Sequence, residues 1–136
     1  MPKPLRHAII ASHPDANSFT LAIARDYAEA VRSHGHEAIV RDLYQRGFDP
    51  VLNLEERNGE PGADVLAEWE TLGEIDVFVL VYPIWFGAPP AMIKGYIDRV
   101  FGAGRTRGSS ERGRAAGRAL NADYSGVAGG FAAPTL

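Results

Sequence analysis

A polar turn near the amino end of the chain carries residue types that bind anions. The turn, residues 13–20, follows a short apolar run, leads into a predicted helix, and contains His13, Ser18 and Thr20. Backbone N–H groups and the helix dipole converge at such a strand-to-helix turn, and the hydroxyls and an imidazole N–H add donors. The pattern therefore indicates a site for an anion such as a phosphate. The sequence leaves open the alternative that Ser18 only caps the helix while His13 packs at the end of the strand.

A second turn combines large aromatic side chains with prolines. Residues 82–90 hold Trp85, Phe86 and three prolines directly after another apolar run. A planar heterocycle needs a flat apolar wall and backbone N–H groups for its polar edge, and a stiff loop of this composition supplies both. The alternative interpretation is an aromatic cluster that only fills the core above a sheet.

Apolar runs and helical spacing predict the elements that position these turns. We expect strands at 6–11, 37–41 and 75–82, and the nearly unbroken apolar character of the third predicts a central strand covered on both faces. Ser18 is a good N-cap for a helix that ends near Gly35, and Asp64 for a short helix through Leu72. A further amphipathic helix begins at Pro90. We expect an irregular segment over 42–53 and an exposed loop over 55–63.

Alternation of strand and helix predicts an α/β fold with a doubly wound parallel sheet and right-handed crossovers. In such sheets ligands bind beyond the carboxyl ends of the strands, at the point where the strand order reverses. The two turns follow the first and third strands, so we expect them to be neighbours in space. No Gly-x-Gly-x-x-Gly and no Gly-Lys-Ser/Thr motif is present, which argues against a Rossmann dinucleotide site and a P-loop.

Composition limits the classes of function. With 136 residues the chain is expected to form one domain, and the absence of cysteine excludes thiolate catalysis and cysteine-based metal sites. A net charge of −3 gives no reason to expect nucleic acid or an anionic membrane as a partner. No signal-peptide pattern and no apolar run of about 20 residues is present, so the expected location is the cytoplasm. We interpret His7, His34 and His36 as surface or strand-edge residues that form no metal site.

Four segments, in order, resemble the NAD(P)H:quinone oxidoreductase family, the DT-diaphorase-like branch of flavoproteins with a flavodoxin-like fold. These segments are His13-Pro14 with residues 18–20, then 42–44 with 48–50, then 82–86, and finally 90–101. The resemblance covers roughly residues 4–104. Together the four segments are specific, whereas any one of them alone would be weak.

The resemblance implies a flavin cofactor, FAD or FMN, reduced by NAD(P)H and reoxidised by a quinone or a similar small acceptor. It implies that the flavin phosphate contacts His13, Ser18, Phe19 and Thr20, and that the isoalloxazine lies along Pro83, Ile84, Trp85 and Phe86. It also implies a homodimer. We expect Lys94 and Arg99 to support packing rather than chemistry. An alternative of another class is a non-catalytic partner subunit, because regulatory subunits of potassium-efflux systems resemble the same family.

The chain departs from the family pattern after Gly104. Residues 1–104, the expected flavodoxin-like half-domain, carry 9 Lys/Arg and 15 Asp/Glu, whereas residues 105–136 carry 5 Arg and 2 acidic residues. This Arg-, Gly- and Ala-rich tail lacks the β-branched run of a buried fourth strand. The sequence therefore predicts an incomplete sheet. Two explanations stay open: a frameshifted or truncated coding end, and a natural short form with a disordered tail.

Overall fold

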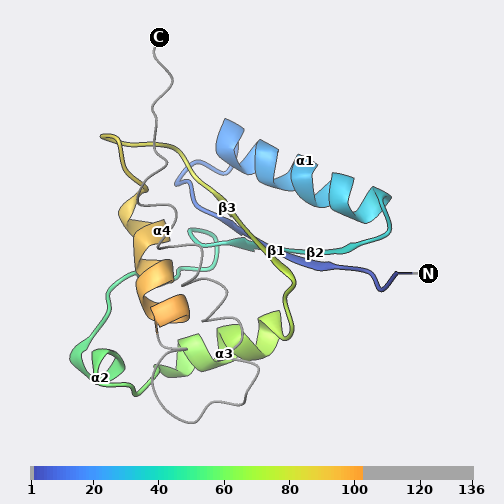
Figure 1. Ribbon diagram of the computed structural model, residues 1–136. Helices are drawn as coiled ribbons and strands as arrows, with labels where there is room; N and C mark the ends of the chain where they lie inside the picture. Colours follow the sequence, from blue (N-terminus) through green and yellow to red (C-terminus); the bar gives the residue numbers. More distant parts are fainter. Residues whose placement is uncertain (1, 103–136) are drawn as a thin grey trace.

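The computed structural model describes residues 2–102 of the chain, and its centre is a parallel sheet of three strands. Strand β1 (Arg6–Ala11) lies between β2 (Glu37–Asp42) and β3 (Val77–Val81), as Figure 1 shows. The order β2-β1-β3 means that the chain continues to one side of β1 and then crosses to the other side. The predicted parallel pairing and the reversal of strand order are therefore confirmed.

Strand β3 differs from the prediction in length and position. It covers residues 77–81 rather than 75–82. Within residues 2–102 it pairs only with β1, and all five of its residues are half-buried, whereas β1 is central and almost fully buried. A second neighbour of β3 can only come from outside residues 2–102, so the expectation that the third strand is central stays a prediction.

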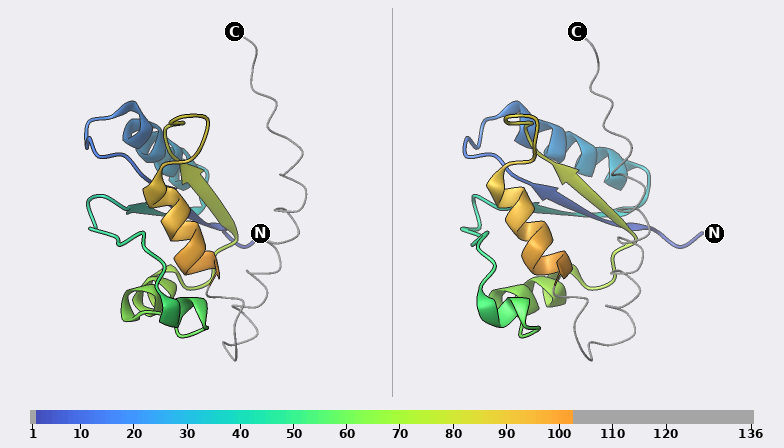
Figure 2. Two further views of the ribbon diagram at one scale, coloured as in Figure 1. Left: turned by 90° about the vertical axis from the view of Figure 1, so that its left-hand side faces the viewer. Right: turned by 60° about the vertical axis from the view of Figure 1, so that its left-hand side comes forward.

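Helices cover both faces of the sheet (Figure 2). Helix α1 (Phe19–Ser33) packs on the face formed by Ile9 and Ala11. Helices α3 (Ala63–Leu72) and α4 (Ala91–Tyr96) pack on the face formed by Ala8 and Ile10. Helix α4 continues without a break into a π-helical turn, η1, over Ile97–Phe101. The predicted helices at 18–34 and 90–101 are thus confirmed, although periodicity did not distinguish the π-helical end.

The expectation of an exposed loop over residues 55–63 is wrong in part, because the first three of these residues belong to helix α2 (Leu54–Arg57). The Asn53 side chain accepts a hydrogen bond from the backbone N–H of Glu56, and the Glu56 carboxylate accepts one from the N–H of Asn53, which is a capping box. Glu56 is buried rather than exposed. The Gly and Pro content of this segment suggested a loop, but the reciprocal cap and a buried partner stabilise a helical turn.

That partner is Arg99 of η1, which gathers two acidic side chains. Its guanidinium donates to the carboxylates of Glu56 and Asp64 at 2.7 Å each and to the backbone carbonyl of Asp49 at 2.6 Å. Hydrogen bonds from Arg99 lower the pKa of both carboxyl groups, and the two carboxylates raise the pKa of Arg99. Arg99 therefore supports packing, as expected.

The same network corrects the predicted start of α3. Gly62 is the N-cap, the helix begins at Ala63, and no side chain caps it. Asp64 was the expected cap, but its carboxylate pairs with Arg99 instead. Asp64 lies one residue inside the first turn, where its carboxylate also accepts the N–H of Val65 at 3.0 Å.

A second buried network lies on the α3–α4 side of the sheet. The Glu68 carboxylate accepts hydrogen bonds from Arg41 and from the hydroxyl of Tyr96. Burial alone would raise the pKa of Glu68, but these two donors lower it, and burial together with Glu68 raises the pKa of Tyr96 well above its ordinary value. Three elements, β2, α3 and α4, are thereby joined by charge as well as by apolar contact.

The surface interpretation of His7 is wrong. Its ring is buried beneath α1, where Nδ1 is 3.1 Å from the hydroxyl of Tyr27, and it stacks on His36 at 6.1 Å between centroids. A strand residue on the α1 face is covered by the helix whatever its polarity. His34, at the end of α1, is exposed as expected.

The expectations for residues 105–136, including the tail and its two explanations, lie outside the described residues. Within residues 2–102, no helix has the length and apolar character needed to span a membrane.

Candidate functional site

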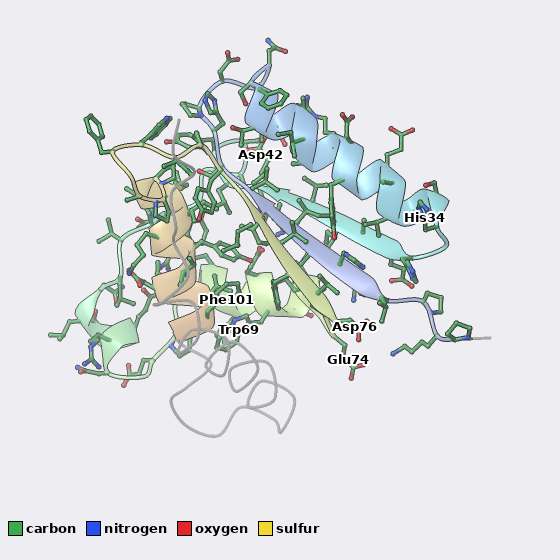
Figure 3. All side chains as sticks on the ribbon, turned by 45° about the horizontal axis from the view of Figure 1, so that its top comes forward. His34, Asp42, Trp69, Glu74, Asp76 and Phe101 are labelled. Atoms are coloured by element: carbon green, nitrogen blue, oxygen red, sulfur yellow. The ribbon has the colours of Figure 1, made fainter. Side chains whose placement is uncertain are left out.

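The two predicted turns lie at the same edge of the sheet. The backbone N–H of Ser12, directly after β1, donates to the carbonyl of Val81 at 3.1 Å, so the ends of β1 and β3 are joined. The N–H of Leu43 likewise donates to the carbonyl of Ala11 at the end of β2. Figure 3 shows Asp42 at this edge, near the start of α1, and Glu74 and Asp76 at the opposite edge. The expectation that the turns after β1 and β3 are neighbours is therefore confirmed.

Direct contact between the turns comes from two rings. The His13 and Trp85 rings meet edge to face, with centroids 5.9 Å apart and planes at 65°. His13 is half-buried, and the exposed fraction of Trp85 is 40%. Trp85 therefore lies beside the polar turn with one side open, and it is not sealed in the core. The structure thus brings together residues 72 positions apart in the sequence, a separation at which only tertiary structure produces contact.

Local hydrogen bonds fix the conformation of the first turn. The N–H of Asp15 donates to Nδ1 of His13, the N–H of Asn17 to the Asp15 carboxylate, both at 2.9 Å, and the N–H of Ser18 to the carbonyl of Asp15. Because Nδ1 of His13 is an acceptor here, the neutral ring carries its proton on Nε2. His13 can therefore donate a hydrogen bond through Nε2–H.

Two backbone N–H groups at the start of α1 have no hydrogen-bond acceptor within residues 2–102. The Ser18 hydroxyl accepts a hydrogen bond from the N–H of Leu21 at 3.3 Å, so Ser18 is the N-cap. Within residues 2–102, the N–H groups of Phe19 and Thr20 have no acceptor, as expected for the first turn of a helix. The Phe19 side chain is 80% exposed, and Thr20 is half-buried. The capping role proposed as the alternative for Ser18 is therefore confirmed, while its hydroxyl hydrogen stays available to a further acceptor.

Two residues at this edge were missed by the sequence analysis. The Ser12 hydroxyl is fully buried and has no hydrogen-bond partner among the described residues. The Arg25 guanidinium donates to the carbonyl of Ala16 at 3.0 Å and brings a positive charge to the turn. A signal for Arg25 was present, because it lies seven residues, or two helical turns, after the N-cap and so on the same side of α1.

The second turn is a tight hairpin. Trp85 and Ala88 exchange two backbone hydrogen bonds of 3.0 Å, and the intervening Phe86 and Gly87 have φ angles of 52° and 74°. A left-handed conformation is uncommon for an aromatic residue and is stabilised here by the two hydrogen bonds. The turn directs the side chains of Ile84 and Phe86 into solvent, whereas Pro83 is half-buried. The N–H groups of Ile84, Phe86 and Gly87 have no acceptor within residues 2–102.

The groups at this edge of the sheet suit recognition of an anion and a planar ring. No group of three or more potential metal ligands lies close together in the described part of the chain. The edge instead offers unpaired backbone N–H groups, an imidazole donor and one open aromatic face. These features can hold an anion at one turn and a planar ring at the other.

Comparisons with known proteins agree with this geometry. Residues 6–128 match the family described as having a flavodoxin-like fold, which extends beyond the range 4–104 marked by the motifs. A Haemophilus influenzae protein named as an uncharacterized NAD(P)H oxidoreductase is 37% identical over 105 residues, which are 74% of this chain and 52% of that protein. An FMN-dependent NADH:quinone oxidoreductase of Geobacillus kaustophilus is 28% identical over 125 residues, which are 76% of this chain and 59% of that protein.

A solved structure gives the same result in three dimensions. The NAD(P)H:quinone oxidoreductase from Methanothermobacter marburgensis superimposes with a TM-score of 0.66 at 31% identity, over 73% of this chain and 54% of that one. The chain thus spans about half the length of the relatives it matches. Sequence match, strand order and superposition agree over the part with the two turns, and the chain belongs to the family with the flavodoxin-like fold.

Proposed function

We propose that the carboxyl edge of the sheet binds a flavin nucleotide and that the protein is a flavin-dependent NAD(P)H oxidoreductase with a quinone-like acceptor. The observation that carries the proposal is the contact between His13 and Trp85, because it joins an anion-binding turn to an aromatic wall. A flavin nucleotide is a ligand with a phosphate and a planar ring on one molecule. The names of the relatives, one of them FMN-dependent, support the same ligand class and the same redox partners.

The residues of the first turn fit the phosphate. The N–H groups of Phe19 and Thr20, the Nε2–H of His13 and the hydroxyls of Ser18 and Thr20 are donors, and an anion at a helix N-terminus is favoured by the dipole. Arg25 adds a positive charge to the turn. The buried Ser12 hydroxyl at the same edge has no hydrogen-bond partner within residues 2–102, so it is a further polar group without an assigned interaction.

The residues of the second turn fit the ring. Pro83, Ile84, Trp85 and Phe86 form an apolar hairpin, and the free N–H groups of Ile84, Phe86 and Gly87 suit the polar edge of a heterocycle. When bound, a flavin supplies the hydride acceptance from NAD(P)H and the reduction of a quinone, chemistry that no side chain of this chain provides. The contribution of the protein is to bind and orient the ring and to exclude water from one of its faces.

The proposal is tested by replacing the wall of the site. Trp85→Ala is expected to weaken flavin binding by about 1 to 3 kcal/mol, because the ring loses its packing surface. The measurement is titration of the purified protein with FMN and with FAD, followed by flavin fluorescence. Trp69→Phe is the matched control, because Trp69 lies against η1, where its Nε1 donates to the carbonyl of Val100, away from the two turns. Equal affinity of the Trp85→Ala and wild-type proteins would contradict the proposed ring site.

Catalysis is tested separately from binding. The flavin-loaded protein is expected to lose its yellow colour under anaerobic NADH or NADPH and to regain it when a quinone is added. Binding without reduction would assign the chain to the non-catalytic class of partner subunits.

A further inference from the structure

His13 is held by one turn and touches the other. Its Nδ1 accepts the N–H of Asp15 at 2.9 Å, which fixes the ring from one side. The edge of the ring meets Trp85, whose backbone is fixed by the two hydrogen bonds with Ala88. Among the described residues, this is the one aromatic contact that the Trp85 indole makes. The His13 ring therefore lies against an indole that is 40% exposed.

We propose that His13 is a positioning residue that sets the plane of the Trp85 indole, so that the phosphate-binding turn also orients the wall of the ring site. This inference rests on the proposed flavin site. It assigns to His13 a role beyond donation to a phosphate. A tryptophan at the base of a two-residue hairpin turn can exchange between staggered rotamers unless a neighbour restricts it, and the edge-to-face contact is such a restriction.

The consequence is that phosphate recognition and ring recognition are coupled through one side chain. A ligand that orders residues 13–20 also orders His13, and through it the indole. Conversely, a ring packed on Trp85 favours the His13 orientation in which Nε2 is free to donate. The coupling is reciprocal, because it is a free energy shared by two parts of one site.

Riboflavin separates the two roles of His13, because it has the isoalloxazine ring but no phosphate. His13→Asn keeps an acceptor for the Asp15 N–H, in the same kind of turn that Asp15 forms with Asn17, but removes the ring. His13→Phe keeps an aromatic edge but removes both nitrogens. We expect His13→Asn to weaken riboflavin binding by about two- to tenfold, and His13→Phe, which keeps the aromatic edge but loses the hydrogen bond from Asp15, to weaken it less. FMN binding is expected to weaken in both variants.

A double-mutant cycle with Trp85 completes the binding test. If His13 acts through the indole, His13→Asn has no further effect on riboflavin affinity in the Trp85→Ala protein. Loss of FMN affinity with unchanged riboflavin affinity in His13→Asn would overturn the inference, because His13 would then act on the phosphate alone. An equal effect of His13→Asn with and without Trp85 would also overturn it.

A measurement without flavin keeps this inference distinct from the proposed function. The chain has two tryptophans, so Trp69→Phe leaves Trp85 as the only indole. In that protein, time-resolved fluorescence anisotropy is expected to show faster local motion of Trp85 after His13→Asn and a smaller increase in motion after His13→Phe. Unchanged anisotropy in His13→Asn would overturn the positioning role even if flavin binds. Changed anisotropy in a protein that binds no flavin would support the contact and reject the proposed function.

Discussion

The two faces of the sheet are stabilised in different ways. On the α1 face, apolar side chains from β1 and α1 pack together over short sequence distances, with Ile9, Ala11, Leu21, Ala24 and Ala28 as the buried cluster. On the other face, ion pairs join segments far apart in the chain, because the buried Arg99 pairs with the buried Glu56 and the half-exposed Asp64, and the buried Glu68 pairs with Arg41. The packing on the α1 face can be predicted from helical periodicity. The ion pairs on the other face require partners that only the folded chain brings together.

The candidate site depends on both faces. Residues 13–20 lead into α1, and residues 82–90 lead into α4. The relative position of the two turns is therefore set by the apolar packing under α1 and by the charged network that holds α4 and η1. Changes on each face test whether this division is correct.

Loss of Arg99 is expected to have the largest effect. Arg99→Met leaves the carboxylate of Glu56, whose side chain is 1% exposed, buried without its partner, and we expect a loss of about 3 to 5 kcal/mol in the free energy of unfolding. Urea denaturation followed by circular dichroism measures it. Lys94→Ala is the control, because Lys94 pairs with Asp98 on the surface of the same helical segment and should change stability by less than about 1 kcal/mol. Similar stability of the two variants would show that the buried ion pair contributes no more to this face than an exposed one.

The charged network also predicts acid sensitivity. Arg99 lowers the pKa of Glu56 and Asp64 below their ordinary values of 4.5 and 3.8, so the unfolded chain binds protons more readily than the folded one. The stabilisation is present above pH 4.5 and is lost as the pH falls through the lowered pKa values of the folded state. Thermal unfolding at pH 7 down to pH 3 is expected to show this loss in the wild type and a shallower pH dependence in Arg99→Met. Parallel curves for both proteins would argue against the pairing.

Close approach of the backbone at Gly95 is expected to have a smaller effect. A Cβ at this position would overlap the backbone of Pro50, so Gly95→Ala must displace the segment that follows β2. We expect a loss of about 1 to 3 kcal/mol in the free energy of unfolding. Gly102→Ala is the control, since among residues 2–102 the nearest atom to its Cβ would be 3.9 Å away. Equal urea midpoints for the two alanine variants would show that the segment is not held against α4.

The smallest stability effect is expected on the α1 face. Ser18→Ala removes the acceptor for the N–H of Leu21 and should lower the free energy of unfolding by about 1 kcal/mol. Ser18→Asp keeps a capping oxygen and should stay close to the wild type in stability, while its negative charge should weaken FMN binding. A Ser18→Ala protein as stable as Ser18→Asp would show that the cap contributes little.

Much of the fold could be predicted from the sequence because its signals are local. The first two strands, α1 and the helix from residue 90 follow from apolar spacing and caps within one segment, and parallel alternation placed the two turns at one edge. Helix α2 carried a local signal, the Asn53 and Glu56 pair of a capping box, which the surrounding Gly and Pro residues outweighed. The buried position of Glu56 was not predictable in this way, because its partner Arg99 lies 43 residues later.

In the candidate site too, the local features could be predicted from the sequence and the long-range contact could not. The anion donors of residues 13–20 were predictable from residue types at a strand-to-helix turn. The contact of His13 with Trp85 was not, because it depends on the turn geometry at Phe86 and Gly87 and on the pairing of β1 with β3. Neither feature appears in periodicity or composition.

The central claim is that two turns distant in the sequence form one flavin site, and an NMR titration tests it most directly. The amide resonances of the 15N-labelled protein are followed as FMN is added. The account predicts that the amides of Phe19 and Thr20 and those of Ile84, Phe86 and Gly87 shift together, with one dissociation constant and one equivalent of FMN. Shifts confined to one turn, or different dissociation constants for the two turns, would contradict it.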